Sequence, residues 1–325
     1  MAVTLEFSTL PPYFYALLSI RRGINEAATD RIQNVVGEEM LHMCLACNIM
    51  NAIGGTPSVA SAEVASAYPR PLPGKVGSTD PQKPWEAQLL PFSVAAMEQG
   101  MHIEEPEAGP IDVKAFVAAA PEEEEPEYQT IGEFYRHLAA KLAQAPASLW
   151  TPHRNQIDDA QFFQGQLFAV NGLEDAIAAI QLIVSQGEGS RQNPVDLDGD
   201  LAHYYRFLEL RENRVLELAD TDHGYVWGAS LNLDFEAKYP AIENPSQHDF
   251  SKESEAVRAA QADCDRTFSA MLDALQAAFE GGVGQLGVAI RHMFEFRMAA
   301  TVAFETPLSN GMTAGPRFVY AGGKA

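Results

Sequence analysis

The chain has 325 residues, of which 46% are hydrophobic and 20% are charged, so a disordered chain is excluded and a globular fold with a sizeable core is expected. Its 44 acidic and 22 basic residues give a formal charge of -22, which excludes nucleic acid and anionic membranes as partners. Only three cysteines occur, too few for a disulfide framework. The start has no basic signal-peptide region, and no stretch approaches the roughly 20 apolar residues of a membrane helix. We therefore expect a cytoplasmic protein.

The first elements predicted are two antiparallel helices, over residues 3–20 and 25–50, joined by a turn at Arg21-Arg22-Gly23-Ile24. The second ends before Gly54-Gly55-Thr56-Pro57, a glycine stop followed by proline. Pro11-Pro12 removes two backbone donors, which predicts a kink or a restart in the first helix. Cys44-x-x-Cys47 lies in an apolar run without a second cysteine pair, and we interpret it as two small core residues.

Residues 68–127 differ from the rest because they hold half of the chain's 20 prolines. This composition predicts a long, mostly irregular loop insert. One short helix is expected within it, beginning at Ser93. The acidic run 122–125 is interpreted as a solvated loop.

Helical periodicity returns after the insert. It predicts core helices over 128–145 and within 172–210, the latter interrupted by a polar insert at 190–200. One or two strands are expected near 224–235. Two C-terminal helices are expected within 251–304, the first capped by Ser251. The whole chain, 1–325, is interpreted as a single all-α domain with a four-helix bundle at its centre.

Glu39 and His42 are the most informative pair. Residues three apart share a helix face, so a carboxylate and an imidazole point the same way from an apolar segment. Carboxylate-bridged dimetal bundles use such Glu-x-x-His pairs, together with single glutamates from other helices. Glu6 is a candidate partner, because it and Glu39 are equally far from the turn centre and should lie at the same height. The alternative is that Glu39, beside Glu38, belongs to a plain surface pair.

A dimetal centre needs a second set of donors. Glu133 and Glu188 can face each other across antiparallel helices, and His203 supplies the missing imidazole. Two substitutes stay open at this stage: Asp200, three residues before His203, and His137, four residues after Glu133. Each of these residues also has a structural interpretation, as a helix-end carboxylate or a satisfied core histidine. The predicted metal-ligand set is Glu6, Glu39, His42, Glu133, Glu188 and His203.

Several segments carry a family resemblance. The ferritin-like domain of iminophenyl-pyruvate dimer synthases, of the violacein and rebeccamycin pathways, is resembled by LEFSTLPPYFYALLSI, GEEMLHMCLACNIMNAIGGTP, LLPFSVAAMEQGMHIEEPE, YQTIGEFYRHL, IVSQGEG, LAHYYRFLEL and AGPRFVY. The resemblance covers nearly the whole chain. It implies a ferritin-like bundle and iron-dependent oxidative chemistry on small substrates derived from amino acids.

The predicted donors, carboxylate oxygens and imidazole nitrogens, suit Fe(II) or Mn(II). We therefore predict two such ions, with dioxygen and a small molecule as substrates. An apolar wall is expected around them, formed by Phe14, Met43, Tyr135 and Phe207. A metal-storage bundle and a non-catalytic structural protein are the alternative functions, and a homo-oligomer is left open.

Overall fold

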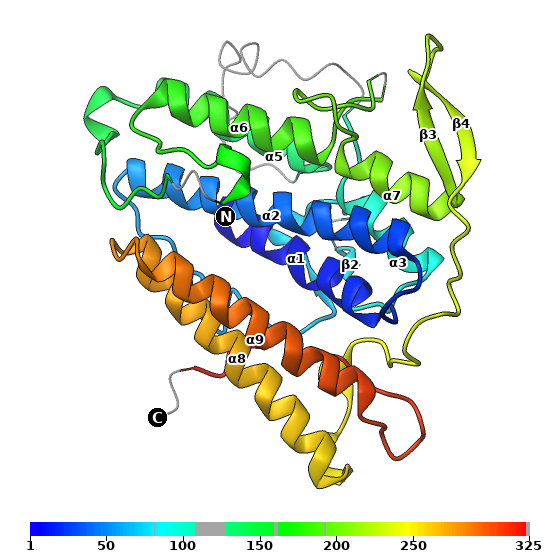
Figure 1. Cartoon of the computed structure of the whole chain (residues 1–325). Helices are drawn as coiled ribbons and strands as arrows, with labels where there is room; N and C mark the ends of the chain where they lie inside the picture. The colour runs from blue at the N-terminus through cyan, green and yellow to red at the C-terminus, as the bar shows by residue number, and fades with distance from the viewer. Residues whose placement is uncertain (81, 108–127, 159–161, 192, 323–325) are drawn as a thin grey trace.

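Helices dominate the computed structural model, as expected for an all-α chain (Figure 1). The structure describes residues 1–80, 82–107, 128–158, 162–191 and 193–322. These residues contain eight α-helices and two small antiparallel sheets. The acidic run 122–125 lies outside the described residues.

The N-terminal hairpin forms as predicted, from helices α1 (Ala2–Ser19) and α2 (Glu26–Ala52). The predicted restart at Pro11-Pro12 does not occur, because α1 is continuous through both prolines. Pro12 cannot donate to the carbonyl of Ser8, and the hydroxyl of Tyr68 donates to that oxygen instead, at 2.7 Å. The loop insert thus supplies a hydrogen bond that the helix itself cannot make.

Helix α3 (Val94–Ile103) is the short helix expected in the insert, and the side chain of Ser93 caps it by accepting from Ala96 N. It packs against α7 (His203–Glu212). At Gly100 the helices approach so closely that a Cβ atom would lie 2.7 Å from the ring of Phe207. This approach places the end of α3 beside the start of α7.

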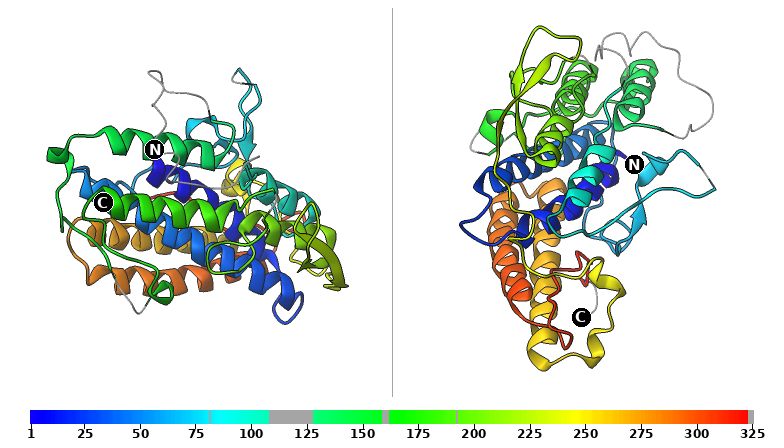
Figure 2. Two further views of the ribbon diagram at one scale, coloured as in Figure 1. Left: turned by 90° about the horizontal axis from the view of Figure 1, so that it is seen from above. Right: turned by 90° about the vertical axis from the view of Figure 1, so that its right-hand side faces the viewer.

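The remaining helices form two pairs on either side of α1 and α2 (Figure 2). One pair is α5 (Ile131–Gln144) with α6 (Leu173–Gly187). The other is the hairpin of α8 (Glu255–Phe279) and α9 (Gln285–Glu305). The middle layer is therefore covered on both faces, and polar groups on its inner surfaces are shielded from water.

The cap expected at Ser251 is wrong. Ser251 lies in a short 3-10 turn, Phe250–Lys252, and Ser254 caps α8 by accepting from Val257 N. The first sheet pairs β1 (Arg70–Pro71) with β2 (Glu86–Ala87), and the second pairs β3 (Arg214–Leu218) with β4 (Tyr225–Ser230). None of the described helices combines the length and apolarity needed to span a membrane.

Candidate metal centre

The hairpin of α1 and α2 brings Glu6, Glu39 and His42 together in its buried interior. Their donor atoms all lie within 4.8 Å of one another. His42 Nδ1 is 3.3 Å from Glu39 Oε1 and 3.8 Å from Glu6 Oε2. The three side chains are at most 2% exposed. The prediction that Glu6 and Glu39 lie at one height is confirmed.

A second group of donors contains Glu39 again, with Glu104 and His203. His203 Nδ1 lies 2.9 Å from Glu39 Oε1 and 3.8 Å from Glu104 Oε2. His203 begins α7, and Glu104 directly follows α3. Because Glu39 belongs to both groups, its carboxylate lies between the two histidines.

Both imidazoles point the same nitrogen into this cluster. His42 Nε2 is 2.9 Å from Oε1 of Gln186, and His203 Nε2 is 2.9 Å from Oε2 of Glu38. These oxygens are acceptors, so each Nε2 donates and each Nδ1 faces the carboxylates. Glu38 is fixed in turn by Arg206, at 2.9 Å. Histidines that bind metals are commonly oriented by such an outer carboxylate or carbonyl.

Three hydroxyl groups hold the carboxylates in the same manner. Tyr135 donates to Oε1 of Glu6, and Thr9 donates to Oε2 of Glu39. Tyr13 donates to Oε1 of Glu104 at 2.6 Å. Each carboxylate thus has one oxygen bound by a hydroxyl and the other directed at an imidazole.

Glu188 is a fourth buried carboxylate beside this cluster. Its Oε1 accepts from the backbone of Gly132, and its Oε2 has no hydrogen-bond partner within the described residues. Burial raises its pKa well above the usual range, although the Gly132 hydrogen bond acts in the opposite direction. Glu104 also raises the pKa of Glu188. The two carboxylates are therefore close enough to interact electrostatically.

The structure does not bring Glu133 into the cluster. Its side chain is only half-buried and accepts from Gln129 N at 2.7 Å, a helix-capping contact at the start of α5. Asp200 is exposed. His137 contacts the ring of Tyr128, with 5.8 Å between centroids, and neither residue belongs to the two donor groups.

Glu104 is the donor that sequence reasoning missed. Glu104 lies in the proline-rich segment 68–127, which the sequence analysis interprets mostly as loop. The signal that could have found it is the spacing of Met97, Gly100 and Glu104, three and four residues apart on one face of a short helix. All three are buried.

Comparison with known proteins agrees with this architecture. The model of the family described as Ferritin-like matches residues 1–212. The chain belongs to the ferritin-like family. The crystal structure of a ferritin-like protein from Caulobacter vibrioides superposes with a TM-score of 0.66 at 22% identity, covering 98% of this chain and 94% of that one. No curated protein matches the chain. The predicted ferritin-like fold is thereby confirmed.

The charges of this ferritin-like cluster are not balanced by the protein alone. Burial and the charge of Glu39 raise the pKa of Glu6 to about 8. Burial would also raise the pKa of Glu39, but contacts with His203 and His42 outweigh it and lower that pKa. Without metal, Glu6 and Glu188 are therefore protonated near neutral pH, because four charged carboxylates beside two imidazoles would be costly in this buried interior. A bound cation would remove this cost.

The donor set fits metal ions. Carboxylate oxygens and imidazole nitrogens are ligands of Fe(II) and Mn(II). His203 Nδ1 and Glu188 Oε2 are buried polar atoms with no hydrogen-bond partner within the described residues, although such atoms are normally satisfied. The close approach of His203 Nδ1 to Glu39 therefore lacks hydrogen-bond geometry, and a metal would complete it.

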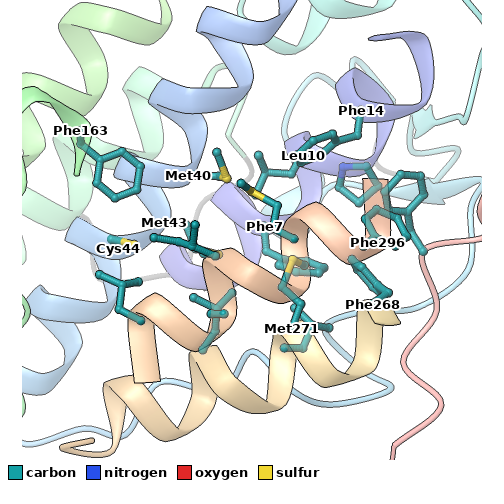
Figure 3. Close-up of a pocket in the computed structure, with 18 residues that line it drawn as sticks. Phe7, Leu10, Phe14, Met40, Met43, Cys44, Phe163, Phe268, Met271 and Phe296 are labelled. Carbon is teal, nitrogen blue, oxygen red and sulfur yellow. The ribbon is translucent and has the colours of Figure 1, made fainter. Parts of the chain in front are cut away.

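The apolar wall expected around the metals is only partly where it was predicted. Tyr135 contacts Glu6 directly, and the ring of Phe207 packs at a tilt against Tyr13, with 4.9 Å between the ring centroids. Phe14 and Met43 instead line an apolar cavity of about 70 Å³ between α1–α2 and α8–α9 (Figure 3). They therefore lie on the side of α1 and α2 that faces α8 and α9.

Replacing Gly132 by alanine should weaken iron binding roughly tenfold, the lower end of the range for outer-shell changes at metal sites. A Cβ atom at this position would overlap the carboxylate of Glu188. The measurement is Fe(II) titration of metal-free protein under anaerobic conditions. The matched control is Gly172→Ala, since Gly172 has no neighbouring atom within 4 Å of the added Cβ. Equal affinity in Gly132→Ala and parent would contradict the role of Glu188.

Proposed function

We propose that this ferritin-like protein is a non-haem iron oxidase or oxygenase with a dimetal-carboxylate centre. Its substrate would be a small metabolite derived from an amino acid, in chemistry similar to that of the iminophenyl-pyruvate dimer synthases. The observation that carries the proposal is the paired donor groups joined by Glu39, each with one imidazole directing Nδ1 inward. A structural bundle has no need of four buried carboxylates at one point.

The residues divide naturally between two ions. Glu6 and His42 would hold one ion, Glu104 and His203 the other, and Glu39 would be shared. Glu188 would serve as a further carboxylate, and Glu133, which the sequence predicts as a ligand, is left out of this set. Two ferrous ions together supply electrons for the reduction of dioxygen.

The protein's own contribution is orientation and exclusion of water. Burial raises the pKa values of Tyr13 and Tyr135 well above the usual range, so both hydroxyls keep their protons and remain donors. They hold Glu104 and Glu6 in fixed orientations. The side chains of all four carboxylates are buried, which keeps bulk water away from reactive species.

A cleft of about 880 Å³ offers a route for the substrate. Its wall includes Glu38 and Arg206, and Glu38 contacts His203 directly. Acidic and basic side chains both line it, including Asp30 and Arg31. An amino acid carries an amine and a carboxylate, so each end would find an opposite charge there.

Oxygen uptake tests the proposed function. Metal-free protein is loaded anaerobically with two equivalents of Fe(II), and oxygen consumption is then followed with and without each of a panel of amino acids and their imine or keto derivatives. An oxidase consumes oxygen in repeated turnovers only with its substrate, and Glu39→Ala does not. Storage would give iron mineral without substrate turnover, and a structural protein would give neither. Either of these results would contradict the proposal.

A further inference from the structure

Helix α9 carries a line of large apolar side chains that face solvent. Phe294, Met298 and Val302 are 58%, 59% and 52% exposed. They are spaced four residues apart, so they lie on one face of the helix. The other face packs inward through Phe296, Ala300 and Phe304. Helix α9 also contacts α1, and Phe294 and Met298 border a groove between α9 and the turn of the α1–α2 hairpin. An exposed apolar line of this kind is typical of an interaction surface.

The line is self-complementary in charge as well as in shape. Arg291 and Glu305 lie at its two ends, each seven residues from Met298, and both are exposed. Phe294 and Val302 each lie four residues from Met298. The five residues fall within an arc of about 80° and span about 21 Å of helix. Reversing the helix about Met298 therefore exchanges Arg291 with Glu305 and Phe294 with Val302.

We propose that two copies of this chain associate through α9, with the helices antiparallel and a two-fold axis passing beside Met298. Phe294 would then pack on Val302 of the partner subunit, and Arg291 would pair with Glu305 of the partner subunit at both ends. A parallel arrangement would place Arg291 against the partner's Arg291 and is disfavoured by repulsion. An isologous contact of this kind is the commonest arrangement in protein dimers.

The terminal charges are available for this pairing. Within the described residues Arg291 makes no ion pair, whereas the nearby Glu295 is paired with His292 at 2.8 Å. In the part of the chain that the structure describes, Glu305 accepts the hydroxyl of Tyr239 at 2.9 Å and forms no ion pair. The interface is independent of the metal centre, because α9 contributes no residue to either donor group.

Charge reversal tests the pairing directly. Parent, Arg291→Glu, Glu305→Arg and the double variant are compared by sedimentation equilibrium over a range of concentrations. Each single reversal creates two repulsive contacts and should raise the dimer dissociation constant at least tenfold. The double reversal restores both attractions and should return the constant close to that of the parent. Iron stoichiometry is measured in every variant to show that the fold is retained.

Cross-linking tests the position of the proposed two-fold axis beside Met298. Antiparallel helices whose axes are about 8–10 Å apart bring facing Cα atoms within the range of a disulfide. Oxidised Met298→Cys should therefore give a covalent dimer, and Val283→Cys, an exposed position off the axis, should not. The natural cysteines are buried and do not interfere. A parent protein that stays monomeric at 100 μM, or a dimer unchanged by Arg291→Glu and by Met298→Asp, would overturn the proposal.

Discussion

Glu39→Ala should leave the purified protein with almost no iron, whereas the parent should carry close to two ions per chain. The reason is that Glu39 is the only residue shared by the two donor groups of the described residues, with Oε1 directed at both histidines. Removing it withdraws a ligand from both sites at once. Metal analysis of protein purified without chelators, or reconstituted anaerobically with Fe(II), measures the loss.

The matched control is Glu133→Ala. Glu133 is also a helix glutamate of the predicted ligand set, but its carboxylate contacts Gln129 N at the surface side of α5. This variant should keep the parent's iron content and lose only a capping contact, which is worth about 1 kcal/mol of stability. If both variants lose iron equally, the assignment of the two donor groups is wrong.

Glu104→Gln should have opposite effects on stability with and without iron. In metal-free protein it replaces a buried acidic group, whose pKa burial raises, by a neutral amide, and the amide oxygen can still accept from Tyr13. The melting temperature should therefore stay equal or rise. Iron should raise the parent's melting temperature by about 5 °C or more, since binding to the folded state alone stabilises it by about 2.7 kcal/mol at one hundred times Kd. In Glu104→Gln, the rise in melting temperature caused by iron should be less than half of the rise in the parent.

Differential scanning calorimetry on metal-free and iron-loaded samples measures both effects. The neighbouring Glu105→Gln is the control, because Glu105 is exposed and pairs with Arg191 at 2.9 Å. It should respond to iron as the parent does. A Glu104→Gln protein that is destabilised without iron and responds fully to it would show that Glu104 is a structural residue rather than a ligand.

The sequence was sufficient for the parts of the site that depend on local periodicity. Glu39 and His42 share a face because they are three residues apart, and Glu6 joins them because a short turn fixes the register of an antiparallel pair. His203 was predicted only by its chemical type. Its place beside Glu39 depends on the packing of α7 against α2, which no local pattern encodes.

Glu104 and the continuity of α1 were missed for a common physical reason. Both depend on the proline-rich segment, whose composition predicts irregular structure. In the folded chain Tyr68 from that segment completes the hydrogen bonding of α1 at Ser8, and α3 carries Glu104 into the interior. Long-range contacts of this kind override local propensity, and they place Glu104 beside Glu39 and His203, where the sequence analysis predicts Glu133.

The shared position of Glu39 has a consequence for how the centre fills. An ion held by Glu6, His42 and the shared Glu39 would fix the Glu39 carboxylate further and so prepare the second donor group for its own ion. Protein that carries one of the two ions would consequently be rare at every iron concentration. Binding of both ions together would prevent a single ferrous ion from reacting with oxygen without a second electron donor beside it.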